Sequence, residues 1–361
     1  MKKGTSNVFA DRTLLVCGGA GFIGSNFIRG MLEQHKHVRI VNLDKLTYSG
    51  NLDNLKDIEH DPRYTFMQGD IADEDTITQV FAEHTPDYVI NFAAETHVDR
   101  SIHVGALEFI NTNVQGVFRI LEAVKKSDHV LRFVQVSTDE VYGSLPLDSK
   151  GRFSERSSFS PNAPYAATKA GGDLLCRAYY STWQLPVLVT HCSNNYGPYQ
   201  YPEKLIPFFI LRMIEGKKLP LYGDGKHVRD WIYVTDHCEA LELCLSDGRP
   251  GAVYNIGADN EMDNRAIAKR ILEHFGRDES WIEHVGDRPG HDRRYAIDSA
   301  LIRKELGWQP RYEFDAAFKQ TLEWYLKNTE WMRRVREKTG VFNPHIDLWR
   351  AHASSDTNKG I

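Results

Sequence analysis

A glycine-rich turn near the start of the chain constrains its fold more than any other feature. The apolar run LLVC leads directly into GGAGFIG, and a helical pattern follows. Gly18, Gly21 and Gly24 suit, in turn, a tight turn, a close approach of the backbone to a pyrophosphate, and close packing of a helix on a sheet. The strand, turn and helix together predict a dinucleotide site. A turn that serves only chain geometry is the alternative.

The first half of the chain alternates short β-branched runs with longer amphipathic segments. This order predicts an α/β fold with a doubly wound parallel sheet of Rossmann type, helices on both faces, and ligands at the carboxyl ends of the strands. The predicted strands cover residues 13–17, 39–43, 64–68, 88–91, 132–137 and 187–191. The predicted helices cover residues 22–34, 74–83, 104–126 and 161–183.

The composition changes after residue 191, where Pro, Gly and aromatic residues become frequent and the alternation fades. We therefore predict a dinucleotide-binding domain over residues 1–192 and a smaller C-terminal substrate domain that takes up most of residues 193–361. A segment near residues 230–256 is expected to return to the first domain, because residues 253–256 have the pattern of one more strand. From residue 299 the pattern predicts short helices and a polar tail, SSDTNKGI, that frays.

Charge and cysteine content argue against several other classes of protein. The formal net charge of −5 offers no overall basic surface for a nucleic acid, and no apolar run is long enough to span a bilayer. The start of the chain, MKKGTSNVFADR, lacks the apolar run of a secretory signal, so a cytoplasmic location is expected. The five cysteines form no CxxC pair and the fifteen histidines are scattered, so we predict reduced thiols and no metal.

A carboxylate at the end of the second predicted strand indicates which dinucleotide is bound. Asp44 lies twenty residues after Gly24, where it can accept hydrogen bonds from the adenosine ribose. Its negative charge would repel a 2′-phosphate and so favours NAD over NADP, although the neighbouring Lys45 weakens that preference. Asp70 and Ile71 follow the next strand and are expected to flank the adenine, unless Asp70 only starts a helix.

Tyr165 and Lys169 stand four residues apart at the start of a predicted helix and therefore share one face. A phenol with an ordinary pKa near ~10 is a poor base at neutral pH, and a nearby ammonium is expected to lower that pKa. Tyr165 could then accept a hydroxyl proton as a hydride leaves. Such a pair is common in sequences and mostly structural. A catalytic role is indicated here by its position after the strand FVQVST.

Several phrases carry a family resemblance. GGAGFIG, STDEVYG and the YxxxK helix together resemble the extended short-chain dehydrogenases/reductases, which include the NAD-dependent sugar-nucleotide epimerases and dehydratases. A closer resemblance, to the dTDP-glucose 4,6-dehydratases, runs from Val16 to Asp298 and rests on LDKLTYSGN, NFAAETHVDRSI, SNNYGPYQYPEKLIP, LPLYGDGKHVRDWIYVTDH and GDRPGHDRRYAID. It implies an NAD-dependent lyase of deoxysugar biosynthesis that converts dTDP-glucose to its 4-keto-6-deoxy form. It also implies a homodimer through the helices at residues 104–126 and 161–183.

Thr138, Asp139 and Glu140 indicate the reaction. Oxidation at C4 of a sugar needs only the cofactor and the Tyr/Lys pair, with Thr138 as a hydrogen-bond partner. Once C4 is a ketone the C5 proton is acidic, so a carboxylate can remove it while a carboxylic acid protonates the departing C6 hydroxyl. The residues alone leave the two roles open, and both could be ordinary loop carboxylates. The resemblance implies that Glu140 is the base and Asp139 the acid, with hydride returned to C6.

The resemblance also implies binding roles elsewhere in the chain. For the substrate it places Thr96 and Thr138 at the hexose, Asn195, Lys204 and Leu205 at the diphosphate and sugar, and Pro220, Tyr222, Arg229, Asn264, Arg288 and His291 at the nucleotide. The expected NAD set is Gly18, Gly21, Phe22, Ile23, Gly24, Asp44, Lys45, Thr47, Asp70, Ile71, Ala93, Ala94, Thr112, Tyr165 and Lys169. Thr112 is expected on the nicotinamide side, and its spacing from AAETH is one residue longer than in the family pattern.

Four arginines are expected to supply positive charge for a diphosphate: Arg229, Arg288, Arg293 and Arg294. The alternative for each of them is a surface salt bridge.

Other functions remain open. The same chemistry could act on another nucleotide-glucose, such as UDP-glucose, because the sequence does not reveal the base pocket. A sugar-nucleotide C4 epimerase or a UDP-glucuronate decarboxylase would share the scaffold, but Asp139 argues against both. A non-enzymatic NAD-binding scaffold would be expected to lose the glycines or the Tyr/Lys pair, and this chain keeps them.

Overall fold

The structure is a computed structural model, and it describes residues 8–103, 105–340, 342 and 343. Two sequence predictions fall partly or wholly outside these residues. They concern Val104, the first residue of one predicted helix, and the polar tail SSDTNKGI. Among the described helices, none combines the length and the apolar character needed to cross a membrane.

Seven parallel strands form the central sheet, in the spatial order β10-β6-β5-β4-β1-β2-β3. They are β1 (Thr13–Cys17), β2 (Arg39–Asp44), β3 (Tyr64–Gln68), β4 (Tyr88–Asn91), β5 (Arg132–Thr138), β6 (Val187–Cys192) and β10 (Val253–Ile256). Every predicted strand is present, and β2, β5 and β6 each extend one residue further than predicted. The strand order reverses between β1 and β4, so a crevice for ligands is expected at their carboxyl ends.

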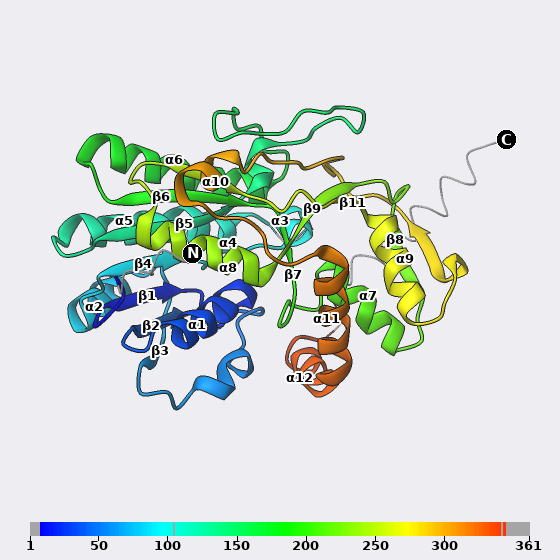
Figure 1. Cartoon of the computed structure of the whole chain (residues 1–361), viewed down its shortest axis with the longest axis horizontal. Coiled ribbons are helices and arrows are strands. Elements are labelled where there is room, and N and C mark those ends of the chain that lie inside the picture. The colour runs from blue at the N-terminus through cyan, green and yellow to red at the C-terminus, as the bar shows by residue number, and fades with distance from the viewer. Residues whose placement is uncertain (1–7, 104, 341, 344–361) are drawn as a thin grey trace.

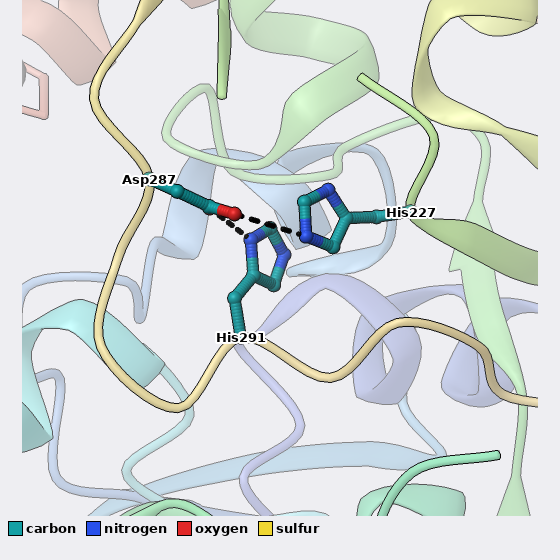
Figure 2. Close-up of side chains that lie close together, drawn as sticks. All are labelled: His227, Asp287 and His291. Atoms are coloured by element: carbon teal, nitrogen blue, oxygen red, sulfur yellow. Dashed lines mark hydrogen bonds and ion pairs between the residues drawn. The ribbon is translucent and has the colours of Figure 1, made fainter. Parts of the chain in front are cut away.

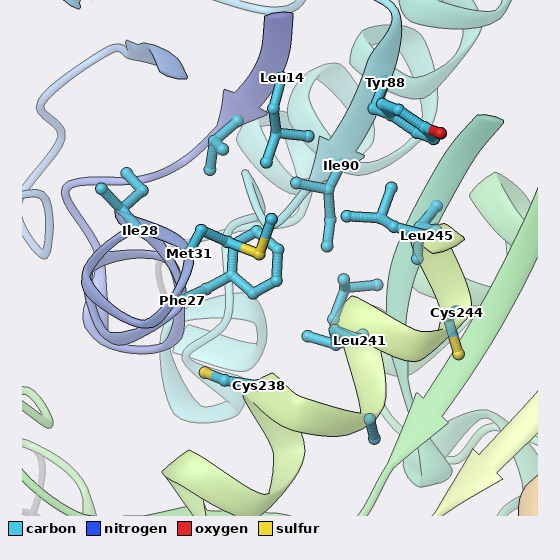
Figure 3. Close-up of a cluster of buried hydrophobic side chains, with 14 of the residues drawn as sticks. Leu14, Phe27, Ile28, Met31, Tyr88, Ile90, Cys238, Leu241, Cys244 and Leu245 are labelled. Atoms are coloured by element: carbon cyan, nitrogen blue, oxygen red, sulfur yellow. The ribbon is translucent and has the colours of Figure 1, made fainter. Parts of the chain in front are cut away.

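Helices cover both faces of this sheet, which confirms the predicted fold class (Figure 1). One face carries α1 (Phe22–Gln34), α8 (Val234–Asp247) and α10 (Ala300–Leu306), and the other carries α2 (Glu74–His84), α5 (Val117–Lys126) and α6 (Pro164–Trp183). On the first face, Phe27 and Leu241 pack with Leu14 and Ile90 (Figure 3). Leu15 belongs to the cluster on the opposite face, as expected from the alternation of side chains along a strand.

The prediction of a single helix over residues 104–126 is wrong. The described residues form α3 (Val98–His103), α4 (Leu107–Ile110), the π-helical turn η2 (Asn111–Gly116) and α5. A π-helical turn holds one more residue than the α-helical turn it replaces. Thr112 lies within η2. The helix predicted at residues 161–183 begins only at Pro164, whose fixed φ suits the first turn of a helix.

The later segments form a smaller lobe beside the sheet, at the right of Figure 1. It contains a three-stranded sheet of order β11-β9-β7 and a two-stranded sheet of β12 and β8. Its strands are β7 (Asn194–Tyr196), β8 (Leu219–Tyr222), β9 (Val228–Tyr233), β11 (Glu261–Asp263) and β12 (Ile282–Val285), and its helices are α7 (Leu205–Ile214), α9 (Asn264–His274), α11 (Phe314–Lys327) and α12 (Thr329–Thr339). Three 3₁₀ turns are also present: η1 (Leu52–Ile58), η3 (Asp139–Tyr142) and η4 (Glu279–Trp281).

The chain returns from this lobe to the main sheet. Strand β10 pairs with β6, which confirms the predicted returning strand. Helices α8 and α10 contribute Leu241 and Ile302 to the core beneath the sheet. The lobe keeps a core of its own, built around Phe209, Trp231 and Phe318.

Candidate active site

The glycine-rich turn forms one end of a cavity at the carboxyl edge of the sheet. Gly18 has a φ of +79°, and a Cβ there would lie 2.5 Å from the backbone nitrogen of Ala93, so only glycine fits. Gly21 precedes α1 and offers no side-chain cap to the first amide groups of that helix. Those N–H groups, together with the positive end of the helix dipole, suit a pyrophosphate.

Asp44 is held in place by the same turn. Its carboxylate accepts hydrogen bonds from the backbone nitrogens of Ala20 at 2.9 Å and Leu46 at 2.8 Å. Burial nevertheless raises its pKa, because the charged form loses water. Lys45 forms an ion pair with Asp70 at 2.7 Å and is therefore engaged away from Asp44. The expected weakening of the NAD preference by Lys45 is correspondingly small.

One cavity collects all the residues that the sequence predicts for NAD. They are Gly18, Gly21, Phe22, Ile23, Gly24, Asp44, Lys45, Thr47, Asp70, Ile71, Ala93, Ala94, Thr112, Tyr165 and Lys169. The cavity continues to Thr138, Asp139 and Glu140 at the end of β5. A dinucleotide along its wall would thus end beside a set of groups that can exchange protons.

Tyr165 and Lys169 lie on the first turns of α6, and both are buried. Burial and the nearby Glu140 raise the pKa of Tyr165 well above its ordinary value, and a hydrogen bond with Thr138 acts in the opposite direction. The prediction that Lys169 lowers this pKa is therefore wrong for the protein alone. The Lys169 Nζ instead donates to the backbone oxygen of Val136 at 2.7 Å, and burial lowers the pKa of Lys169 itself.

Asp139 and Glu140 begin η3, directly after β5. The Thr138 hydroxyl oxygen accepts from the Glu140 backbone nitrogen at 3.3 Å and so caps this turn. Burial, with Glu140 nearby, raises the pKa of Asp139 well above its ordinary value. Burial also raises the pKa of Glu140, but Arg288 and Arg229 oppose that rise. Asp139 is therefore the better candidate for a neutral acid, and Glu140 for a charged base.

A second cavity adjoins the first and is lined mainly by the smaller lobe. Of the residues predicted for the substrate, it contains Thr96, Lys204, Leu205, Pro220, Tyr222, Arg229, Asn264, Arg288 and His291, while Thr138 and Asn195 line the first cavity. Thr96, Glu140 and Lys204 line both. Glu140 therefore stands where the two cavities meet.

One buried arginine, Arg229, and one partly buried arginine, Arg288, give the second cavity its positive charge. Arg229 donates to the backbone oxygen of Asp292 at 3.0 Å and lies over the ring of Tyr295, 4.2 Å from its centre. Arg288 lies 3.6 Å from a carboxylate oxygen of Asp99. Fixed guanidinium groups of this kind suit the oxygens of a diphosphate.

Arg293 and Arg294 do not share this position. Arg293 pairs with both carboxylate oxygens of Asp224, at 3.0 and 2.8 Å, and Arg294 pairs with Glu261 at 2.7 and 3.1 Å. Neither arginine lines either cavity. The expectation that both supply charge to the site is therefore wrong, because nearby carboxylates already bind them.

His227, Asp287 and His291 come together beside the second cavity, although 64 residues separate the two histidines in the chain (Figure 2). Asp287 accepts from His291 at 2.6 Å and from the Arg288 backbone nitrogen at 2.9 Å, and His227 Nε2 lies 3.2 Å from its other oxygen. The two imidazoles stack with ring centres 3.6 Å apart. These contacts hold the turn that carries Arg288 and His291.

The same three residues are the one group with metal-ligand spacing among the described residues, with ligand atoms within 4.8 Å of one another. A guanidinium nitrogen of Arg293 lies 3.2 Å from His227 Nε2, the atom that would bind a metal. The positive charge of that guanidinium would repel a metal cation. The cluster therefore fits a turn-ordering role better than a metal site.

Comparison with known proteins places this geometry in a family. The profile of the GDP-mannose 4,6 dehydratase family matches residues 15–321. The dTDP-glucose 4,6-dehydratase of Xanthomonas campestris pv. campestris is 49% identical over 340 residues, which cover 90% of this chain and 95% of the relative. The chain belongs to the dTDP-glucose 4,6-dehydratase family. The resemblance predicted from the sequence is thereby confirmed.

Solved structures agree with membership of the dTDP-glucose 4,6-dehydratase family. One from Streptomyces venezuelae, with NAD and TYD bound, is 46% identical, covers 90% of this chain and 99% of its own, and has a TM-score of 0.86. A UDP-glucose 4-epimerase from Thermotoga maritima, with UDP-glucose, reaches a TM-score of 0.81 at 28% identity, over 88% of this chain and 99% of its own. The fold is thus shared with epimerases, and sequence identity separates the families.

Sequence reasoning missed several residues that line the dTDP-glucose 4,6-dehydratase site. Glu95 and Asp99 lie within the motif AAETHVD, and Asn194 and Glu203 stand beside residues that were predicted. Their position within these motifs was an available signal. His227 and Asp287 also lie within quoted motifs, but their contact could not be predicted, because only the packing of the start of β9 against the turn after β12 brings them together.

Proposed function

We propose that the chain converts dTDP-glucose into dTDP-4-keto-6-deoxyglucose and water, with NAD as a cofactor that is reduced and reoxidised within one turnover. The observation that carries the proposal is the Asp139-Glu140 pair beside Tyr165 and Lys169, where the two cavities meet. An oxidoreductase that only oxidises C4 would need no such pair. Family membership supports the same reaction.

The residues of the first cavity fit NAD. The turn from Gly18 to Gly24 and the uncapped start of α1 would hold the pyrophosphate, and Asp44 would accept from the ribose hydroxyls. Bound there, NAD⁺ would supply a reversible hydride acceptor for the sugar and a positive charge that favours a phenolate. Thr112 and Ala93 would face the reactive end.

Tyr165 acts as the base for the C4 hydroxyl. Its buried phenol needs a cation and hydrogen-bond partners to lose its proton, because burial alone raises its pKa. Lys169 lies one helical turn away and supplies a cation, and Thr138 supplies the hydrogen bond. The proton of the C4 hydroxyl moves to the phenolate oxygen while the hydrogen on C4 leaves as a hydride.

Glu140 and Asp139 carry out the elimination. Glu140, whose charged form Arg288 and Arg229 favour against the effect of burial on its pKa, takes the C5 proton made acidic by the C4 ketone. Asp139, kept neutral by burial, donates its proton to the departing C6 hydroxyl, which leaves as water. Glu140 then returns its proton to C5.

The sugar nucleotide is held by the second cavity. Arg229, Arg288 and Lys204 would face the diphosphate, Thr96 and Asn195 the hexose end, and Asn264 and Tyr222 the nucleotide. We propose thymidine as the base because of family membership. A competition between dTDP-glucose and UDP-glucose tests this choice of base, because an enzyme that used another nucleotide for the same chemistry would not prefer dTDP-glucose.

One labelling experiment tests the reaction. The purified protein is incubated with dTDP-glucose that carries deuterium at C4, and the product is analysed by mass spectrometry and NMR. We expect loss of water and deuterium in the C6 methyl group. A galactose isomer would indicate an epimerase, and a methyl group without label would contradict the internal return of hydride.

We further propose a homodimer that works in the cytoplasm. Large apolar side chains are exposed along neighbouring helices α4 and α6: Leu107, Ile110, Leu174 and Trp183. A second copy would cover them. The five cysteines are all unpaired and buried, as is usual in a reducing compartment.

Light scattering tests the dimer. Leu174→Glu should convert the dimer to a monomer, because it places charge in the proposed interface. Leu326→Glu alters another exposed leucine, on α11, and should leave the dimer intact. A wild-type monomer, or dissociation by both variants alike, would contradict the proposed interface. Fractionation of cells tests the location.

A further inference from the structure

The loop between β2 and η1 forms one wall of the cofactor cavity. Lys45, Thr47, Ser49 and Gly50 line that cavity. Leu46, in the same loop, has a φ of +56°, a backbone conformation that a leucine rarely adopts. A loop in a disfavoured conformation keeps its shape only if other parts of the fold hold it there.

Helix α12 supplies two such contacts, although it lies near the other end of the chain. Lys338 Nζ donates to the backbone oxygen of Gly50 at 3.0 Å, and Arg334 Nε donates to Oδ2 of Asp53 at 2.8 Å. The two pairs are separated by 288 and 281 residues in the sequence. A Cβ at Gly50 would lie 2.9 Å from Oδ1 of Asp44. The helix therefore holds the loop against the carboxylate that is expected to bind the ribose.

A third contact continues from α12 to the glycine-rich turn. Trp331 Nε1 donates to Oδ1 of Asn54 at 2.9 Å, and Nδ2 of Asn54 donates to the backbone oxygen of Ala20 at 3.0 Å. Trp331 is 5% exposed and Asn54 is 2% exposed. Because a buried amide oxygen without a donor is unfavourable, the Trp331 N–H fixes the orientation of the Asn54 amide. The end of the loop is thereby tied to the turn that would hold the pyrophosphate.

We propose that Trp331, Arg334 and Lys338 form a clasp that holds this loop over the cofactor and slows the release of NAD. They are positioning residues, since none of the three lines the cofactor cavity. A cofactor that is reduced and reoxidised within one turnover does not need to leave between turnovers, so slow release suits the proposed reaction. The inference rests on the cofactor of the proposed function and not on its elimination step.

The rate at which the loaded protein releases NAD tests the clasp. NAD-loaded protein is mixed with an excess of fluorescent etheno-NAD, and the exchange is followed by stopped-flow fluorescence. Lys338→Met keeps the apolar stem but removes the donor to Gly50, and Trp331→Phe keeps an aromatic ring but removes the N–H. Each should raise the dissociation rate of NAD roughly two- to tenfold, the range for one lost hydrogen bond, and the triple variant with Arg334→Ala should raise it about 10²-fold.

Two controls separate the clasp from a general loss of stability. Arg333→Ala changes an exposed arginine of the same helix, whose partners, Glu330 and Glu337, lie on α12 itself. Phe318→Leu weakens the core of the smaller lobe at a ring that stacks on Phe314. Both should release NAD at the wild-type rate, even though Phe318→Leu lowers the free energy of unfolding.

Hydrogen exchange of the NAD-free protein gives a second measurement. The amide hydrogens of residues 45–54 should exchange faster in the triple variant than in the wild type, and those of β1 should not change. Circular dichroism verifies that each variant is folded.

Three results would overturn the clasp: release of NAD at the wild-type rate by the triple variant, an equal acceleration by Arg333→Ala, or unchanged hydrogen exchange in the loop. Failure of the proposed function is distinguishable, because both measurements are made without a sugar nucleotide. A protein that formed no 4-keto-6-deoxy product would still show whether these three residues control the release of NAD.

Discussion

The two cavities of this site are built in different ways. In the first, the predicted cofactor residues follow the ends of successive parallel strands, as Gly18 follows β1 and Asp44 ends β2. In the second, Tyr222 comes from β8, Arg229 from β9 and Arg288 from the turn after β12. Parallel strands in one sheet place their carboxyl ends along the same edge, whereas the second cavity depends on packing between separate small sheets. Cofactor sites of this kind are therefore easier to locate from sequence than substrate sites.

The two cavities also hold their charged side chains in different ways. The first cavity fixes a carboxylate, Asp44, with two backbone hydrogen bonds, one from Ala20 in the glycine turn and one from Leu46 just after β2. The second holds Arg229, which is buried, and Arg288, which is partly buried, against partners from distant segments. Burial lowers the pKa of Arg229, whereas for Arg288 burial is outweighed by Asp99 together with other nearby groups such as Glu140, and the pKa is raised. Each cavity can therefore be disturbed separately.

The largest effect is expected at the junction of the two cavities. Glu140→Gln keeps the size of the side chain but removes the base, so elimination should slow by about 10²–10⁴-fold, the usual contribution of general acid–base catalysis. C4 oxidation depends on Tyr165 and should still occur. Stopped-flow absorbance of the reduced cofactor and mass spectrometry of the product separate the two steps. Unimpaired elimination would exclude Glu140 as the base.

A second variant tests the substrate cavity alone. Arg288→Ala removes a charged hydrogen bond of about 1.5–3 kcal/mol, so the KM for dTDP-glucose should rise roughly ten- to 150-fold with NAD content unchanged. Arg293→Ala is the control, because Arg293 is bound to Asp224 outside both cavities, and its KM should stay near that of the wild type. An equal rise in KM for both variants would show that the position of Arg288 in the second cavity, and of Arg293 outside it, makes no difference to substrate binding.

A third variant tests the cofactor cavity alone. Gly18→Ala forces a Cβ to within 2.5 Å of the Ala93 nitrogen at a positive φ, so the free energy of unfolding should fall by about 1–3 kcal/mol and NAD content should drop. Gly30→Ala is the control, since Gly30 lies inside α1 with its nearest neighbour at 3.9 Å. That change should raise the free energy of unfolding by about 0.4–1 kcal/mol. Urea unfolding of both variants measures the difference.

The smallest effect is expected on the free energy of unfolding, from the turn that carries Asp287 and His291 (Figure 2). Burial by itself would raise the pKa of Asp287, but hydrogen bonds from His227 and His291 outweigh it and hold this pKa below its ordinary value. The resulting stabilisation is present above the unfolded pKa of about 3.9 and is lost as the pH falls toward the folded value. Asp287→Asn should therefore lower the free energy of unfolding by about 1 kcal/mol near neutral pH, since the group is partly exposed, and by less at acid pH.

Asp128→Asn is the control for that experiment, because the Asp128 side chain is fully exposed. In chemical unfolding at several pH values, Asp128→Asn should show no pH-dependent loss in the free energy of unfolding relative to the wild type. If Asp287→Asn lowers the free energy of unfolding by the same amount at every pH, the charge of the Asp287 carboxylate does not stabilise the turn.

Particular residues show where prediction from the sequence ended. The strand ends and the glycine turn were correctly located, because short parallel strands have a strong local pattern. The helix over residues 104–126 was not, because the π-helical turn around Thr112 keeps a helical pattern of apolar residues while adding one residue. The pKa of Tyr165 was predicted in the wrong direction, because spacing along a helix does not reveal burial. Arg293 and Arg294 resemble Arg288 in sequence, and only their carboxylate partners distinguish them.

By itself, the sequence determined the parallel sheet, the dinucleotide turn, the preference for NAD and the set of acid–base residues after β5. All of these depend on residues close together in the chain or on a regular order of strands. Only the tertiary structure decided which carboxyl group has its pKa raised more strongly and which arginines line the second cavity. Those properties arise from burial and from contacts between distant segments, and the free energy of a charge depends on its surroundings far more than on its neighbours in sequence.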